Sequence, residues 1–96
     1  MNYRGAGDAS KGIDLLERTV NLRMELLGRD HADTLIDMNS LAVAYGAAGK
    51  LDLALPLFEE TLKLRKAKLG PEHPHTLASM NNLAGAHLAA GNLDLG

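Results

Sequence analysis

Residues 69–96 read LGPEHPHTLASMNNLAGAHLAAGNLDLG, and residues 27–54 read LGRDHADTLIDMNSLAVAYGAAGKLDLA. The two segments start 42 residues apart and are identical at 16 of their 28 positions. The frame extends towards the N-terminus, because residues 1–26 share eight further positions with residues 43–68. A repeat of this length is typical of stacked supersecondary units, which form extended surfaces and not enclosed catalytic clefts.

Each period reads as two helices. Apolar residues recur at helical spacing over residues 34–48 and 52–68, and the same pattern predicts helices over residues 10–27 and 74–90. The predicted helices end at glycines that can adopt a positive φ, namely Gly28, Gly49, Gly70 and Gly91. No strand pattern occurs in the sequence. We therefore expect an all-α solenoid fragment of about four antiparallel helices in the order B–A–B–A, where A is the first helix of a period and B is the second.

The frame divides the chain into one full period and two partial ones. We expect a single repeat domain over residues 1–96, with a partial repeat that supplies a helix B at 9–27, a full repeat at 28–69 and a partial repeat at 70–96. Residues 92–96 are expected to open a further helix B. Pro56 is expected near a helix start, where its missing N–H costs little. Met38 and Met80 recur with the period and are expected in the core of the stack.

Composition narrows the possible functions. The chain has 10 basic and 12 acidic residues, a net charge of −2, which does not favour nucleic-acid binding. It contains no cysteine, so disulfides and thiolate metal sites are excluded. No apolar run reaches the roughly 20 residues that span a bilayer, and the first residues lack the apolar core of a signal peptide. We expect a cytoplasmic protein with neither nucleic acid nor membrane as a partner.

The repeated motif resembles the tetratricopeptide repeat, in the longer 42-residue form found in kinesin light chains. The residues that carry the resemblance in the second copy are Leu69-Gly70, Glu72-His73-Pro74, Thr76-Leu77, Asn81-Asn82-Leu83-Ala84 and Gly91. In the first copy they are Leu27-Gly28, Asp30-His31, Thr34-Leu35, Asn39-Ser40-Leu41-Ala42, Tyr45, Gly49, Ala54 and Pro56-Leu57. The resemblance implies a right-handed superhelix whose concave face is lined by A helices and holds a peptide or a partner helix.

The resemblance also implies which residues face a ligand. The expected peptide-binding residues are Asn39, Ser40, Val43, Asn81, Asn82 and Gly85. Asn82 matches an asparagine that hydrogen-bonds an extended peptide backbone, and Ser40 is a shorter substitute for it. For Asn39 and Asn81, a structural bond to the neighbouring repeat or to a loop is the favoured interpretation. Some family members hold a peptide carboxylate with asparagine and a basic residue, but Val43 and Gly85 stand at the asparagine positions and neither A helix carries Lys or Arg.

Catalysis and metal binding find little support in the sequence. The only suggestion of a metal is His73-x-His75 together with His31, and zinc needs three or four ligands that converge at about 2.0–2.1 Å. His31 and His73 occupy the same position in successive repeats, so they are expected to order the loop before each A helix. No acid–histidine–nucleophile grouping or phosphate-binding loop is visible. We expect no metal, no cofactor and no catalytic activity, and a hydrolase or metal enzyme is the least favoured hypothesis.

The outer helices lack one neighbour each. On the first helix, the face left open is expected to carry Ile13, Leu16 and Val20, and on the last helix it is expected to carry Leu83 and His87. His87 also occupies the position of Tyr45, which favours a partly buried packing residue. These surfaces predict a homo-oligomer as the alternative function, either as a closed dimer or as an open stack.

Overall fold

Four helices make up the part of the chain that the structure describes. The computed structural model describes residues 6–91 and gives α1 (Ala6–Leu27), α2 (Ala32–Ala47), α3 (Leu51–Leu69) and α4 (Pro74–Ala89). Residues 6–91 contain no strand. The expected all-α architecture is therefore confirmed, with α1 and α3 as B helices and α2 and α4 as A helices. The further helix expected at 92–96 lies outside the described residues.

The repeated glycines and histidines set the ends of the helices. Gly28 and Gly70 follow the B helices with φ of 94° and 97°, a conformation that costs little only without a Cβ. Before each A helix, a histidine accepts a hydrogen bond on Nδ1 from the backbone N–H two residues later. His31 accepts from Asp33 at 3.1 Å, and His73 accepts from His75 at 3.0 Å. The loop-ordering role expected for these two histidines is confirmed, and its form is an N-cap.

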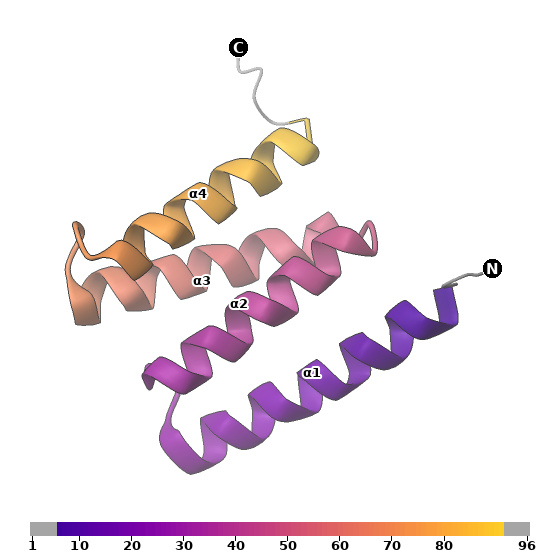
Figure 1. Ribbon diagram of the computed structural model, residues 1–96, viewed down its shortest axis with the longest axis horizontal. Helices are drawn as coiled ribbons and strands as arrows, with labels where there is room; N and C mark the ends of the chain where they lie inside the picture. The colour runs from indigo at the N-terminus through magenta and orange to yellow at the C-terminus, as the bar shows by residue number, and fades with distance from the viewer. Residues whose placement is uncertain (1–5, 92–96) are drawn as a thin grey trace.

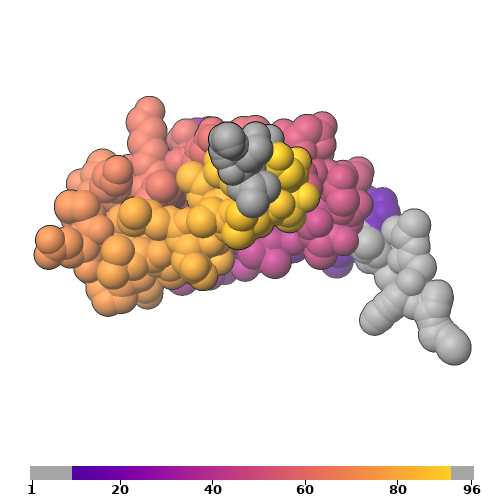
Figure 2. All heavy atoms as spheres, turned by 90° about the horizontal axis from the view of Figure 1, so that it is seen from above, coloured from indigo at the N-terminus to yellow at the C-terminus, as the bar shows by residue number. Residues whose placement is uncertain are grey.

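The helices lie side by side in chain order. Each packs against the next one along the chain, with α1 and α4 at the two ends of the row (Figure 1). Figure 2 views the molecule from the α4 end, where no other described helix lies in front of α4. The described residues thus have two end helices that each contact one principal neighbour, and two central helices that each contact two.

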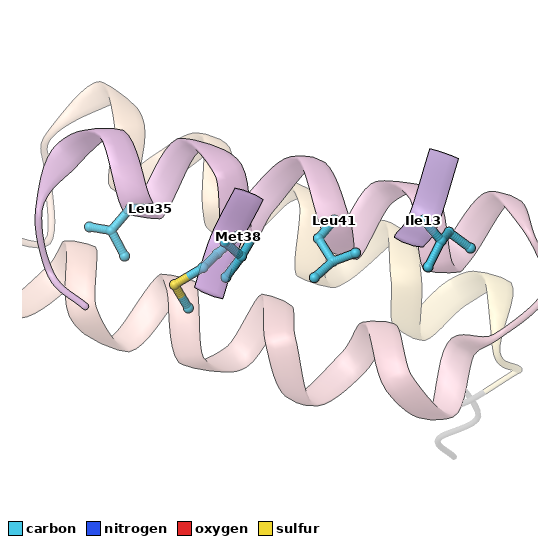
Figure 3. Close-up of a cluster of buried hydrophobic side chains, with 5 residues drawn as sticks. Ile13, Leu35, Met38 and Leu41 are labelled. Atoms are coloured by element: carbon cyan, nitrogen blue, oxygen red, sulfur yellow. The ribbon is translucent and has the colours of Figure 1, made fainter. Parts of the chain in front are cut away.

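The core lies between the helices in two adjoining clusters. In the first, Leu35, Met38 and Leu41 of α2 pack against Ile13 and Val20 of α1 (Figure 3). The second joins α2, α3 and α4, and its buried members are Ala42, Ala54, Phe58 and Ala86. Alanine at three of these four positions allows close approach of the helices, which explains a core that contains few aromatic side chains.

Two expectations about single residues are wrong. Met38 is fully buried, but Met80 is 46% exposed, because no described helix follows α4 to cover the corresponding side. Pro56 is the sixth residue of α3 and lies inside the helix, beyond the first turn. Its ring therefore removes one hydrogen bond from the helix interior.

Candidate functional site

The A helices present a neutral surface to solvent. We call it the A-helix face, and it comprises Ile36, Ser40, Val43 and Ala47 of α2 with Ala78, Asn82, Gly85 and Ala89 of α4. All of these residues are exposed except Asn82, which is half-buried. They recur at intervals of three and four residues, so each set lies along one side of its helix. The face carries no charged side chain, and neither helix contains Lys or Arg.

A pair of amides joins the two halves of this face. Asn82 Nδ2 donates a hydrogen bond to Asn39 Oδ1 at 2.9 Å, and both side chains are half-buried. Asn39 thus makes the structural bond to the neighbouring repeat that was expected of it. Asn82 makes the other half of that bond, while Asn81 is exposed. Within residues 6–91, Asn39 Nδ2 and Asn82 Oδ1 take no further hydrogen bond, so the pair offers one donor group and one acceptor to a ligand.

Polar contacts join each A helix to the preceding B helix. Arg65 of α3 donates from Nη1 to Ser79 Oγ at 2.9 Å and to the His75 carbonyl oxygen at 3.3 Å. Burial lowers the pKa of the Arg65 guanidinium. One period earlier, Arg23 of α1 pairs with Asp37 at 2.7 Å and with Asp33 at 3.4 Å. The same inter-repeat contact therefore occurs twice, once with a hydroxyl as the main acceptor and once with carboxylates.

A hollow of about 550 Å³ lies between the two B helices, over α2. Its lining includes Val20 and Met24 of α1, Leu57 of α3, and Tyr45 of α2. Tyr45 donates from its hydroxyl to Glu17 Oε2 at 2.5 Å. Burial, and secondly the hydrogen bond and negative charge of Glu17, raise the pKa of Tyr45 to about 12. From the sequence, only a packing role was predicted for Tyr45. The bond joins residues 28 apart on neighbouring helices, and helical periodicity alone does not detect such a contact.

The open sides of the end helices differ from those expected. Ile13 and Val20 are buried against α2 and Leu16 is half-buried there, so the expectation that they face solvent is wrong. The side of α1 that lacks a neighbour instead carries Leu15, Leu22 and Leu26, which are 62%, 58% and 78% exposed. The reason is that α2, the following A helix, covers the side of α1 that carries Ile13 and Val20, and no described helix covers the other side.

The same correction applies to α4. Leu83 packs against the core cluster shared with α3, and His87 is half-buried, so neither forms the open side. The uncovered apolar residues are Leu77, Met80 and Leu88, at 50%, 46% and 57% exposed. The partly buried packing role expected for His87 agrees with its burial.

The described residues contain no group of three or more side chains suited to a metal ion. His73 and His75 meet edge to face with ring centroids 5.1 Å apart, and His73 Nδ1 is occupied by the cap. Among residues 6–91, no helix combines the length and the apolar character needed to cross a membrane.

Comparison with known proteins identifies the repeat. The family model described as "Tetratricopeptide repeat" matches residues 1–67 and again residues 38–95. The chain belongs to the tetratricopeptide repeat family. Tetratricopeptide repeats serve in general as scaffolds for protein–protein interaction and not as catalysts, and this chain carries two overlapping matches to them. No curated protein matches the chain.

The chain is also similar to solved structures of tetratricopeptide-like repeats. The chain is similar to the nearly identical TPR-like repeats of a Podosopora anserina protein described as a kinesin light chain, with 34% identity and a TM-score of 0.83. A variant of that protein, in which methionine replaces one glutamine, gives 34% identity and a TM-score of 0.84. In both cases the match covers 90% of this chain and 41% of the other chain. The tetratricopeptide repeats described here thus span less than half of these relatives.

Proposed function

We propose that this tetratricopeptide repeat chain is a protein–protein interaction module that binds an extended peptide across the A-helix face. The observation that carries the proposal is the Asn39–Asn82 pair, which lies between two exposed rows of neutral side chains. An extended peptide presents an N–H and a C=O at each residue. The free Asn82 Oδ1 and Asn39 Nδ2 are one acceptor and one donor group of the type that such a backbone needs.

The side chains around the pair favour a neutral ligand. Ile36 and Val43 are about half exposed and offer apolar contact, while Ser40, Gly85 and the alanines leave room for a backbone to approach. Neither A helix supplies a cation to hold a free carboxylate. The proposed ligand is therefore an internal peptide segment with small or apolar side chains, held by its backbone, and not a C-terminal carboxylate.

Selection from a random peptide pool, followed by binding measurements, tests this proposal. A selected peptide should bind wild-type protein and should lose at least about tenfold in affinity when Val43→Glu places a charge on the face. Leu53→Glu is the matched control, because Leu53 is 45% exposed and Val43 is 50% exposed, and Leu53 lines the hollow and is not part of the A-helix face. Failure to enrich any peptide, or equal binding by both variants, would contradict the assignment.

The second candidate function is self-association through the end helices. It is favoured by the exposed leucines of α1 and by the exposed Leu77, Met80 and Leu88 of α4. Rows of large apolar side chains at this spacing are typical of helix-packing surfaces. Light scattering over a concentration series tests this candidate directly: a mass that rises with concentration supports it, and a constant mass of 10.2 kDa contradicts it.

A further inference from the structure

The two open sides have counterparts inside the molecule. We call Gly12, Leu15, Thr19 and Leu22 of α1 the front stripe, and Leu77, Met80, Ala84 and Leu88 of α4 the rear stripe. The equivalent positions one repeat of 42 residues later than the front stripe are Ala54, Leu57, Thr61 and Leu64 of α3. The equivalent positions one repeat earlier than the rear stripe are Leu35, Met38, Ala42 and Gly46 of α2.

Those counterparts face each other within the chain. Leu57 and Leu64 pack against the cluster that contains Leu35 and Met38. Ala42 and Ala54 are fully buried in the second cluster, and Thr61 is also fully buried. The α2–α3 hairpin is therefore an existing interface, of which the rear stripe repeats one half and the front stripe repeats the other half. This agreement indicates that the two stripes complement each other and not themselves.

Two positions differ in size between the stripes and their counterparts in the α2–α3 hairpin, one on each stripe and in opposite directions. A Cβ added at Gly46 would lie 3.9 Å from Leu51 Cδ2, so the end of α2 lies beside the first turn of α3 with ordinary van der Waals spacing. The rear stripe has the larger Leu88 in place of Gly46, while the front stripe has the smaller Gly12 in place of Ala54. A Cβ at Gly12 would meet nothing within 4 Å among the described residues, so there is room beside it for a larger partner.

A polar pair marks the same register. Asn81 is the counterpart of Asn39, and Ser40 is the counterpart of Asn82. Both Asn81 and Ser40 are exposed. If a second copy placed its α1 beside α4, its α2 would lie next along the A-helix row. Its Ser40 hydroxyl would then face Asn81 Oδ1, in the arrangement that joins Asn82 to Asn39 within the chain.

We propose that a second copy of this chain docks its front stripe on the rear stripe, so that α4 and the incoming α1 form a hairpin like that of α2 and α3. This proposal rests on the second candidate function and gives it a geometry. The two stripes belong to helices at opposite ends of the row (Figure 1). An interface between different surfaces at opposite ends propagates head to tail and leaves an open stack instead of a closed two-fold dimer.

Two charge variants test the geometry. Leu22→Glu blocks the front stripe and Met80→Glu blocks the rear stripe, and both positions are exposed, so each variant should keep its helical circular dichroism. Wild type should grow in mass with concentration, whereas each variant alone should remain at the mass of one chain. An equimolar mixture should form a species of two chains and no larger, because only one pair of intact stripes is available. Leu15→Glu and Leu77→Glu replace any variant that loses helicity, and Leu53→Glu should assemble like wild type.

The outcomes separate the two levels of the proposal. A two-chain species in the mixture alone supports the head-to-tail hairpin. Growth of either single variant, or a mixture that stays at one chain while wild type grows, overturns the geometry but leaves self-association standing. A wild type that stays at one chain at every concentration overturns both.

Discussion

Arg65 Nη1 donates a hydrogen bond to Ser79 Oγ at 2.9 Å, and both side chains are buried. The corresponding Arg23 is less buried and pairs with Asp37 at 2.7 Å. The guanidinium of Arg65 has little water to replace a lost partner, whereas that of Arg23 is partly hydrated. One inter-repeat contact therefore exists in a buried and in an exposed form within the same chain.

The buried form should matter more for stability. We expect Arg65→Met to lower the free energy of unfolding by about 2 kcal/mol, because it leaves the Ser79 hydroxyl buried without a partner. Arg23→Met should cost less than about 1 kcal/mol, which is the usual range for an exposed ion pair. Urea unfolding of both variants gives the comparison.

A second substitution checks the cause. Ser79→Ala introduced into the Arg65→Met variant should recover part of the loss, because it removes the unpaired hydroxyl. Equal losses for the two arginine variants, or no recovery in the double variant, would show that Arg65 stabilises the fold by some other contact.

Tyr45 should make the stability depend on alkaline pH. Its pKa is raised to about 12 in the folded chain, against about 10 for an unperturbed tyrosine, so the folded state binds the phenolic proton more tightly. The contribution is fully present below about pH 10 and is lost as the pH rises towards 12. The free energy of unfolding of wild type should therefore fall more steeply over this range than that of Tyr45→Phe.

Spectroscopic titration separates the causes of that shift. A Tyr3→Phe background leaves Tyr45 as the only tyrosine of the two in the chain. Adding Glu17→Gln should move the titration midpoint down, because the charge-assisted bond and the repulsion disappear. The midpoint should remain above the ordinary value, since burial is the largest cause. A midpoint near the ordinary value before any change at Glu17 would contradict the contact.

The fold could be predicted from the sequence because the apolar helical periodicity and the glycines at the helix ends recur in each repeat. The predicted helices 34–48, 52–68 and 74–90 agree within two residues with those observed, and the glycine ends agree with them. The first helix begins at Ala6, four residues before its expected start.

The open sides could not be predicted in the same way. The first helix is apolar on two sides, one with Ile13 and Val20 and the other with Leu15 and Leu22. Its counterpart α3 uses both sides, because it packs against α2 and α4. Periodicity shows that both sides are apolar but does not show which one α2 covers. A structural bond was expected for Asn39, but its partner was not, because the bond joins Asn39 to Asn82, 43 residues away. A comparison of equivalent positions 42 apart does not detect a contact that is offset by one residue.

The histidine caps should be replaceable by another acceptor. His31→Ala removes the Nδ1 that accepts from the Asp33 N–H, and should lower the free energy of unfolding by about 1 kcal/mol. His31→Asn keeps a side-chain acceptor at the same position and should cost less than half of that. Thermal and urea unfolding measure both effects. Equal losses for alanine and asparagine would mean that the imidazole acts by packing and not by capping.

Buried threonines offer a test of unpaired polar groups. Thr34 and Thr76 occupy the same position in successive repeats, both are fully buried, and the hydroxyl of neither has a hydrogen-bond partner among the described residues. Replacing Thr34 by valine keeps the branched shape and similar helix propensity while it removes the unpaired hydroxyl. Thr34→Val should therefore raise the free energy of unfolding by about 1 kcal/mol, and Thr76→Val should change it in the same direction.

Thr61 provides the matched control. It is equally buried, but its Oγ1 donates to the Leu57 carbonyl oxygen at 2.8 Å. Thr61→Val removes a satisfied hydrogen bond, and its effect should lie between neutral and a loss of about 1 kcal/mol. Because the three sites share residue type and burial, a difference in sign between Thr34→Val and Thr61→Val isolates the hydrogen bond as the cause. Stabilisation by all three substitutions would instead assign the gain to the added apolar surface.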